Sequence, residues 1–200
     1  MAGPRFPTLI VGGGIGGLAT ALALGRAGRP VHVVEKAPDF GEIGAGLQLA
    51  PNAMAVLDRL GLTAEISKHA VYPSRLVWMD ALQGTRITAV DLGEAFRCRY
   101  GHAYIVMHRA DLLAVLLEAC RAEKLVTLEA DREIAAIEDR GDTVRARSAD
   151  GVLYDTDLLI GADGLHSRVR RLVSDDALVY DGLVAYRGAI PMERMSTHAG

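Results

Sequence analysis

The chain has 200 residues, half of them hydrophobic and 24% charged, and its formal net charge at pH 7 is −3. These values describe a globular chain that can bury a core, and they give no electrostatic reason to expect nucleic acid or a membrane surface as a partner. Its two cysteines and six histidines show no metal-ligand spacing, so no metal site is expected, and such sparse use of cysteine favours a reduced, cytoplasmic setting.

The N-terminal segment has the pattern of a strand, a helix and a second strand. Residues 8–11 form a short apolar and β-branched run, as in a strand buried on both faces. We expect a helix over 15–28 and a second buried strand over 31–34. This order predicts a βαβ unit in a parallel sheet.

Three glycines follow the first strand. Gly12, Gly14 and Gly17 give the spacing G-x-G-x-x-G, in which the first allows a tight turn, the second admits a diphosphate and the third lets the helix approach the sheet. The positive end of the helix would then face the phosphates. Glu35 ends the second strand, 18 residues after Gly17, where a carboxylate can accept hydrogen bonds from an adenosine ribose. The unit therefore predicts a dinucleotide site, and the alternative is a turn shaped by packing alone.

The middle of the chain is expected to alternate loops with short elements outside the parallel sheet. In chain order these are a glycine-rich loop at 37–50, a helix at 51–60, strands at 75–80 and 85–90, and a polar loop at 92–101.

The second half predicts another strand and helix, followed by a three-strand β-meander. In chain order the expected elements are a strand at 104–107, a helix at 109–124, a parallel strand at 125–128, meander strands at 134–138, 143–148 and 152–156, a buried strand at 158–161, a short helix at 167–173 and an extended region at 179–191. Cys120 lies on the apolar face of the helix at 109–124, where we expect a small core residue.

A second motif, D-G-x-x-S-x-x-R, begins at Asp163. It places Gly164, Ser167 and Arg170 at fixed offsets after a buried strand. By itself the motif favours a capped helix start, with Asp163 as the cap and the arginines on a solvated face.

Together the two motifs resemble the FAD-dependent aromatic hydroxylases of the para-hydroxybenzoate hydroxylase superfamily, which carry both in their N-terminal half. Further segments look like the 3-hydroxybenzoate 6-hydroxylase and salicylate hydroxylase subgroup, and the similarity covers nearly all of the chain. These segments are GEIGAGLQLAPNA (41–53), DLGEAFRCRYG (91–101), HRADL (108–112) and YRG (186–188).

The resemblance implies a role for each matching position. The residues expected to hold FAD, without a covalent link, are Gly12, Gly14, Gly17, Glu35, Lys36, Ala45, Gly46, Leu47, Gln48, Arg109 and Asp163. Residues 45–48 would run along the flavin, whereas Gly164 and Arg170 would lie on the route of the nicotinamide donor. For Lys36 and Arg109 the alternative is an exposed, solvated cation. Arg109 opens its helix, where a cation opposes the helix dipole and calls for an anion nearby. No residue is assigned as a catalytic base.

The implied reaction is hydroxylation of a phenolic acid, with O2 and NADH or NADPH, through a flavin C4a-hydroperoxide. A homodimer is one option for the full-length protein. Three alternatives stay open: a nicotinamide-dependent dehydrogenase on the same βαβ unit, a flavin-binding half that is inactive alone, and a flavoenzyme of the same fold that performs epoxidation or reduction. The dehydrogenase is disfavoured, because it would lack the glycine-rich loop and the second motif.

The expected fold class is α/β, with a Rossmann-like FAD-binding domain, a parallel sheet and a meander. The family also carries a third flavin signature of the G-D-A-A-H type, and this block is missing from residues 1–200, so the chain resembles an N-terminal half. The expected division assigns 1–75 to the FAD-binding βαβ unit and flavin loop, 76–100 to a substrate-domain excursion, 101–178 to the continued FAD-binding domain, and 179–200 to the start of a mixed-sheet substrate domain.

Overall fold

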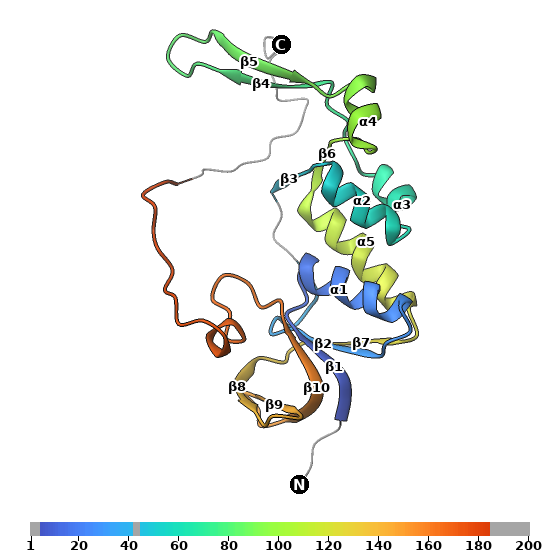
Figure 1. The fold of residues 1–200 in the computed structure, drawn as a ribbon, viewed down its shortest axis with the longest axis vertical. Coiled ribbons are helices and arrows are strands. Elements are labelled where there is room, and N and C mark those ends of the chain that lie inside the picture. The colour runs from blue at the N-terminus through green and yellow to red at the C-terminus, as the bar shows by residue number, and fades with distance from the viewer. Residues whose placement is uncertain (1–4, 42–44, 185–200) are drawn as a thin grey trace.

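A computed structural model describes residues 5–41 and 45–184, and a six-stranded sheet lies at its centre (Figure 1). Its strands are β1 (Arg5–Val11), β2 (Val31–Val34), β7 (Val126–Glu129), β8 (Ile134–Asp139), β9 (Val144–Ser148) and β10 (Leu153–Gly161). The order across the sheet is β7-β2-β1-β10-β9-β8. The first four strands in this order are parallel, and β9 and β8 continue the sheet in antiparallel pairs. The predicted Rossmann-like α/β fold with a meander is confirmed.

The remaining elements form helices and two small ribbons. They are α1 (Ile15–Arg26), α2 (Pro51–Arg59), α3 (Thr63–Ser67), α4 (Glu94–Tyr100), α5 (Arg109–Ala122), the 3₁₀ turn η1 (Arg170–Leu172), and the strands β3 (Gly46–Leu49), β4 (Arg75–Met79), β5 (Arg86–Asp91) and β6 (Ile105–His108). β3 pairs with β6, and β4 pairs with β5, each pair antiparallel. The β4–β5 ribbon lies outside the parallel sheet, as predicted, at the opposite end of the molecule from the meander (Figure 1).

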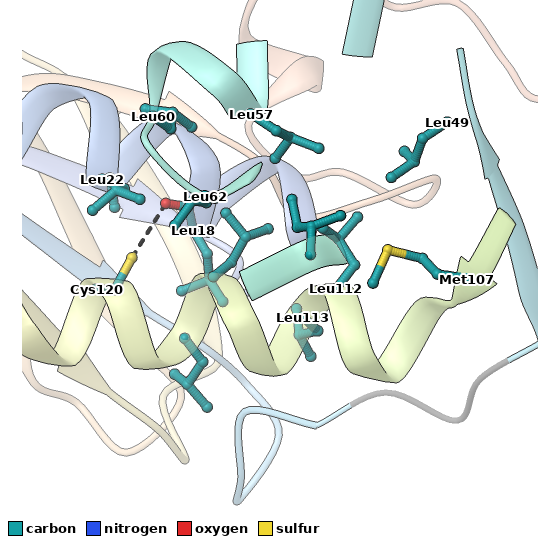
Figure 2. Close-up of a cluster of buried hydrophobic side chains, with 14 of the residues drawn as sticks. Leu18, Leu22, Leu49, Leu57, Leu60, Leu62, Met107, Leu112, Leu113 and Cys120 are labelled. Carbon is teal, nitrogen blue, oxygen red and sulfur yellow. Dashed lines mark hydrogen bonds between the residues drawn. The ribbon is translucent and has the colours of Figure 1, made fainter. Parts of the chain in front are cut away.

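One core lies between the central sheet and the helices α1 and α5, and it continues to α2, α3 and the β3–β6 ribbon (Figure 2). Leu18 of α1 and Leu112 of α5 are buried there, and a fully buried leucine side chain contributes about 1.5–3 kcal/mol. Cys120 is also fully buried, and its thiol donates a hydrogen bond to the carbonyl oxygen of Leu18 at 3.3 Å. Burial raises the pKa of Cys120 to about 11, so the thiol is inert. The prediction of a small core residue is confirmed.

A second core lies beneath the opposite face of the sheet, where the meander packs. Its buried side chains come from β1, β2 and the three meander strands: Leu9, Val11, Val34, Ile134, Ala146 and Tyr154. Because the two cores fix both faces of β1 and β2, the carboxyl ends of these strands are held firmly in place.

The predicted loop at 92–101 is wrong, since it contains the helix α4. Gly93 precedes the helix, Glu94 lies in its first turn, and Gly101 ends it with φ of 77°. No residue of α4 is buried. The helix therefore has no apolar period by which it could be found in the sequence.

The predicted loop at 37–50 is also wrong in part, because it contains β3. Leu47 pairs with Met107 and Leu49 with Ile105 of β6. The partner strand comes much later in the chain, so local sequence alone carried little sign of this pairing. The short helix α3 was not predicted either.

The strands expected at 152–156 and 158–161 are one strand, β10. It pairs antiparallel with β9 over its first half and parallel with β1 from Asp155 to Gly161. Asp157 interrupts the apolar pattern but stays on the strand as an exposed residue.

The helix expected at 167–173 is reduced to the 3₁₀ turn η1. Ser167 Oγ accepts the N–H of Arg170 at 2.9 Å, and such a side-chain bond to the backbone competes with helix formation. Of the extended region expected at 179–191, residues 179–184 form neither helix nor strand, and the rest lies outside the described residues, as does the YRG segment. The division into domains stays a prediction.

Candidate functional site

A cleft of about 550 Å³ opens where the parallel strands reach their carboxyl ends. Its lining comes from the glycine turn after β1, the end of β2, the start of α5, the segment between β7 and β8, and residues 162–168 after β10. Ligands of open α/β sheets bind at this edge, so the cleft is the candidate functional site.

The glycine turn forms a backbone cradle at one end of the cleft. Gly12 has φ of 109°, and a Cβ there would lie 2.2 Å from the carbonyl oxygen of Ala162. A Cβ on Gly17 would lie 1.9 Å from the carbonyl oxygen of Gly12. A Cβ on Gly14, by contrast, would meet no protein atom within 4 Å. The first and third glycines therefore serve close packing, whereas Gly14 keeps space open in the cleft.

The N-terminus of α1 begins at this cradle. It has no side-chain cap and no acidic residue in its first turn. The first N–H groups of a helix lack partners within the helix, and its dipole makes this end positive. The cradle and the helix start therefore fit the diphosphate of a dinucleotide.

Glu35 stands beside the cradle at the end of β2 and lines the cleft. Its Oε2 accepts the N–H of Gly13 at 2.6 Å, and its Oε1 accepts the N–H of Ala37 at 2.9 Å. These two bonds fix the carboxylate but use only part of its capacity, because each oxygen has a second lone pair. The remaining lone pairs fit the hydroxyl groups of a ribose.

The structure brings most, but not all, of the predicted site residues to this cleft. Those that line it are Gly12, Gly14, Glu35, Lys36, Arg109, Asp163 and Gly164. Gly17 lies behind the turn, and Gly46, Leu47 and Gln48 form β3. Ala45, just before β3, accepts the backbone N–H of Arg109 at 3.2 Å and so ties the start of α5 to this strand.

The second motif is split between two places. Asp163 lines the main cleft, and its carboxylate accepts hydrogen bonds from Ser167 Oγ at 2.5 Å and from the N–H of Arg168 at 2.7 Å, as the capped-turn interpretation requires. Arg170 lines a different cleft of about 390 Å³ and forms an ion pair with Asp176. The motif therefore does not bring Arg170 to the main cleft.

Sequence reasoning missed several lining residues. Among them are Gly13, Phe40, Arg132, Glu133, His166 and Arg168. The ring of Phe40 lies where a Cβ on Gly13 would be, at 2.4 Å. The place of Arg132 could have been found from topology, because β7 is parallel and ends at the same edge of the sheet as β2.

A polar cluster lies beneath this edge around Glu129, the last residue of β7. Its carboxylate receives hydrogen bonds from Arg132 Nε at 2.6 Å and from the Tyr154 hydroxyl at 3.0 Å, and it lies 2.8 Å from His32 Nε2. Burial raises the pKa of Glu129, but the hydrogen bonds outweigh it and hold this pKa below its ordinary value. Burial and the bond to Glu129 raise the pKa of Tyr154 to about 12.

Within residues 5–41 and 45–184, no group of three or more His, Cys, Asp and Glu side chains could hold a metal ion. None of the helices in this part of the chain is both long enough and apolar enough to cross a membrane.

Comparison with known proteins agrees with this geometry. A family model described as the FAD binding domain matches residues 5–182. The 3-hydroxybenzoate 6-hydroxylase 1 of Aquipseudomonas alcaligenes is 43% identical over 188 residues, which are 94% of this chain and 48% of that protein. The 6-hydroxynicotinate 3-monooxygenase of Bordetella bronchiseptica is 33% identical over 183 residues, 91% of this chain and 47% of that protein.

The solved structure of the flavin-dependent monooxygenase PieE in complex with FAD and substrate is similar with a TM-score of 0.74 at 27% identity, over 85% of this chain and 32% of that one. The chain spans about half the length of the curated relatives it matches. These findings confirm the resemblance to the N-terminal half of FAD-dependent aromatic hydroxylases. The chain belongs to the FAD-binding domain family.

Proposed function

We propose that the full-length protein is an FAD-dependent monooxygenase that hydroxylates a phenolic acid such as 3-hydroxybenzoate or salicylate, with O2 and NADH or NADPH. The observation that carries the proposal is the cleft itself, in which a glycine cradle, an uncapped helix start and the fixed carboxylate of Glu35 lie side by side. A cytoplasmic location belongs to the same proposal.

The residues of the cleft divide the work of holding FAD. The N-terminus of α1 and the N–H groups of the glycine turn would stabilise the diphosphate, and Glu35 would accept hydrogen bonds from the adenosine ribose. Lys36 and Arg109 add positive charge around the same space. FAD, when bound, supplies hydride acceptance and oxygen activation, while this chain positions it and excludes water from it.

The roles of the other predicted site residues are proposals of the same kind. The resemblance implies that residues 45–48 would run along the flavin. Gly46, Leu47 and Gln48 lie on β3, and Ala45 directly precedes it. Gly164 would lie near the nicotinamide donor. Arg170 lines the separate cleft, and its place on the nicotinamide route is a proposal carried by the resemblance alone.

The names of the relatives support the substrate class. One acts on 3-hydroxybenzoate and another on 6-hydroxynicotinate, and both names describe an aromatic carboxylate that carries a hydroxyl group. We therefore favour a hydroxylated aromatic acid over an apolar ring.

The test uses the purified full-length protein. It should be yellow, release intact FAD on denaturation, and oxidise NADH or NADPH faster when 3-hydroxybenzoate or salicylate is present, with a hydroxylated product identified by mass spectrometry. Release of FMN, or a colourless protein that ignores added FAD, would contradict the cofactor assignment. An epoxide or a reduced product would favour the alternative flavoenzyme, and substrate oxidation without flavin would favour the dehydrogenase.

A further inference from the structure

Arg132 is a lining residue of the cleft whose guanidinium is held by two carboxylates. Its Nε donates to Glu129 Oε1 at 2.6 Å, and its Nη1 donates to Asp150 Oδ2 at 2.9 Å. The side chain is 29% exposed, so it is largely enclosed but reaches the cleft.

The carboxylate of Glu129 is itself fixed by the second core. Its Oε2 lies within hydrogen-bond distance of His32 Nε2 and the Tyr154 hydroxyl, and both of these residues are buried. The rings of His32 and Tyr154 pack against each other, with centroids 5.7 Å apart, and Phe6 packs against both. Glu129 cannot move without breaking these contacts, and this fixes the position of the Arg132 side chain.

The backbone places Arg132 at the adenosine end of the cleft. Its N–H donates to the carbonyl oxygen of Glu35 at 2.8 Å, and the N–H of Asp131 donates to the carbonyl oxygen of Ala37 at 2.9 Å. Arg132, which follows β7, therefore lies next to Glu35, the residue that would hold the ribose.

Charge and geometry decide which part of a dinucleotide suits Arg132. Two carboxylates face one guanidinium, so the cluster does not attract a diphosphate. A guanidinium donates its hydrogen bonds within its plane, whereas an aromatic ring stacks on its face, so the bonds to the two carboxylates do not compete with stacking. An uncharged purine meets both conditions.

We propose that Arg132 stacks on the adenine of FAD and that Glu129 is a positioning residue for it. This inference rests on the proposed function, because it assumes that the cleft holds FAD.

The experiment measures the affinities of FAD and ADP for the full-length apoprotein by calorimetry. ADP carries the adenine but no flavin. We expect R132M to weaken both ligands by the same factor, about tenfold, as for loss of a partly desolvated cation–π contact. R132K should bind both ligands nearly as weakly as R132M does, because the ammonium group of lysine lacks a planar face. The matched control is R145M, which removes an arginine held by Asp155 outside the cleft and should change neither affinity.

The role of Glu129 is tested by combining variants. E129Q should weaken ADP binding in the wild-type background. It should cause no further loss of ADP affinity in the R132M background, since its effect passes through Arg132. A merely structural role would weaken ADP equally in both. Should E129Q fail to fold, Y154F removes one of the donors that fix Glu129 and takes its place in the same cycle.

The possible failures are distinguishable. Wild-type apoprotein that does not bind FAD would contradict the proposed function itself. Wild-type protein that binds FAD, together with unchanged FAD and ADP affinities in R132M, full recovery in R132K, or loss of FAD affinity alone, would overturn the role proposed for Arg132.

Discussion

Glu35 illustrates how a single residue serves both the fold and the proposed ligand. Its carboxylate accepts N–H groups from the glycine turn and from Ala37. We expect Glu35→Ala to weaken FAD binding by about 1–3 kcal/mol, the usual cost of losing a charged hydrogen-bond partner. The site of ring hydroxylation should not change, because the ribose is remote from the reacting ring. Fluorescence titration of the apoprotein and product analysis measure the two effects.

The control for this variant is Glu138→Ala, which removes a meander carboxylate paired with Arg140 outside the cleft. It should leave FAD affinity unaltered. Unaltered affinity in Glu35→Ala would show that Glu35 does not hold the ribose.

Two glycines of the turn should respond differently to the same substitution. In Gly17→Ala the new Cβ would clash with the carbonyl oxygen of Gly12, so we expect the apoprotein to lose about 1–3 kcal/mol of stability. In Gly14→Ala the Cβ meets no protein atom, so the apoprotein should keep its melting temperature but bind FAD about tenfold or more weakly, because the methyl group fills the diphosphate space. Thermal unfolding and FAD titration separate the two. A stable Gly17→Ala apoprotein, or normal FAD binding by Gly14→Ala, would contradict these assignments.

At the residue scale, the sequence could predict only those site residues that local chemistry marks. The glycine spacing and the acidic residue at the end of β2 are such local features, and both lie at the cleft. Arg132 and Phe40 carry no motif, and their places depend on how distant segments meet at the sheet edge. Arg170 lies in the second cleft, and its place on the nicotinamide route stays a prediction.

At the scale of elements, Glu129 links three strands through its side chain, since His32 lies on β2 and Tyr154 on β10. Its pKa is below the ordinary 4.5. A lowered pKa in the folded state contributes stability that is present above the unfolded value and is lost as pH falls through the folded value. We expect the stability difference between wild type and Glu129→Gln to be greatest near pH 7 and to shrink as the pH falls below 4.5. Urea unfolding at several pH values measures this difference, and a difference independent of pH would contradict the link.

Several of the elements that were predicted correctly have a buried face. α1, α5, β1 and β2 contain leucines or valines at regular spacing, and their burial follows from it. α4 has no buried residue and β3 depends on a remote partner, so neither has a local apolar signal. That β10 is one strand and not two could not be predicted locally, because the strand is defined by its pairing with both β1 and β9 in the sheet.

At the scale of the whole molecule, the βαβ unit, the meander and the cleft follow from the sequence, but the surroundings of the cleft do not. The second cleft, beside β10 and η1, and the β4–β5 ribbon leave apolar side chains uncovered in the described part of the chain. Their exposed members include Val77, Trp78, Ile87, Leu172 and Val173. Exposed apolar patches of this kind mark surfaces where other protein segments pack.

This exposure predicts how the 200 residues behave by themselves. Trp78 is 49% exposed and Val173 is 86% exposed, and the curated relatives are about twice as long as this chain. We expect the 200-residue chain, expressed alone, to associate or aggregate, to retain FAD at less than one equivalent and to hydroxylate no phenol, because much of the apolar surface remains uncovered. Size-exclusion chromatography with light scattering, flavin absorbance and product analysis test these three points. The full-length protein is the control, and it should be soluble and loaded with FAD. A monomeric, yellow 200-residue chain with coupled hydroxylation would show that these residues already form a complete enzyme.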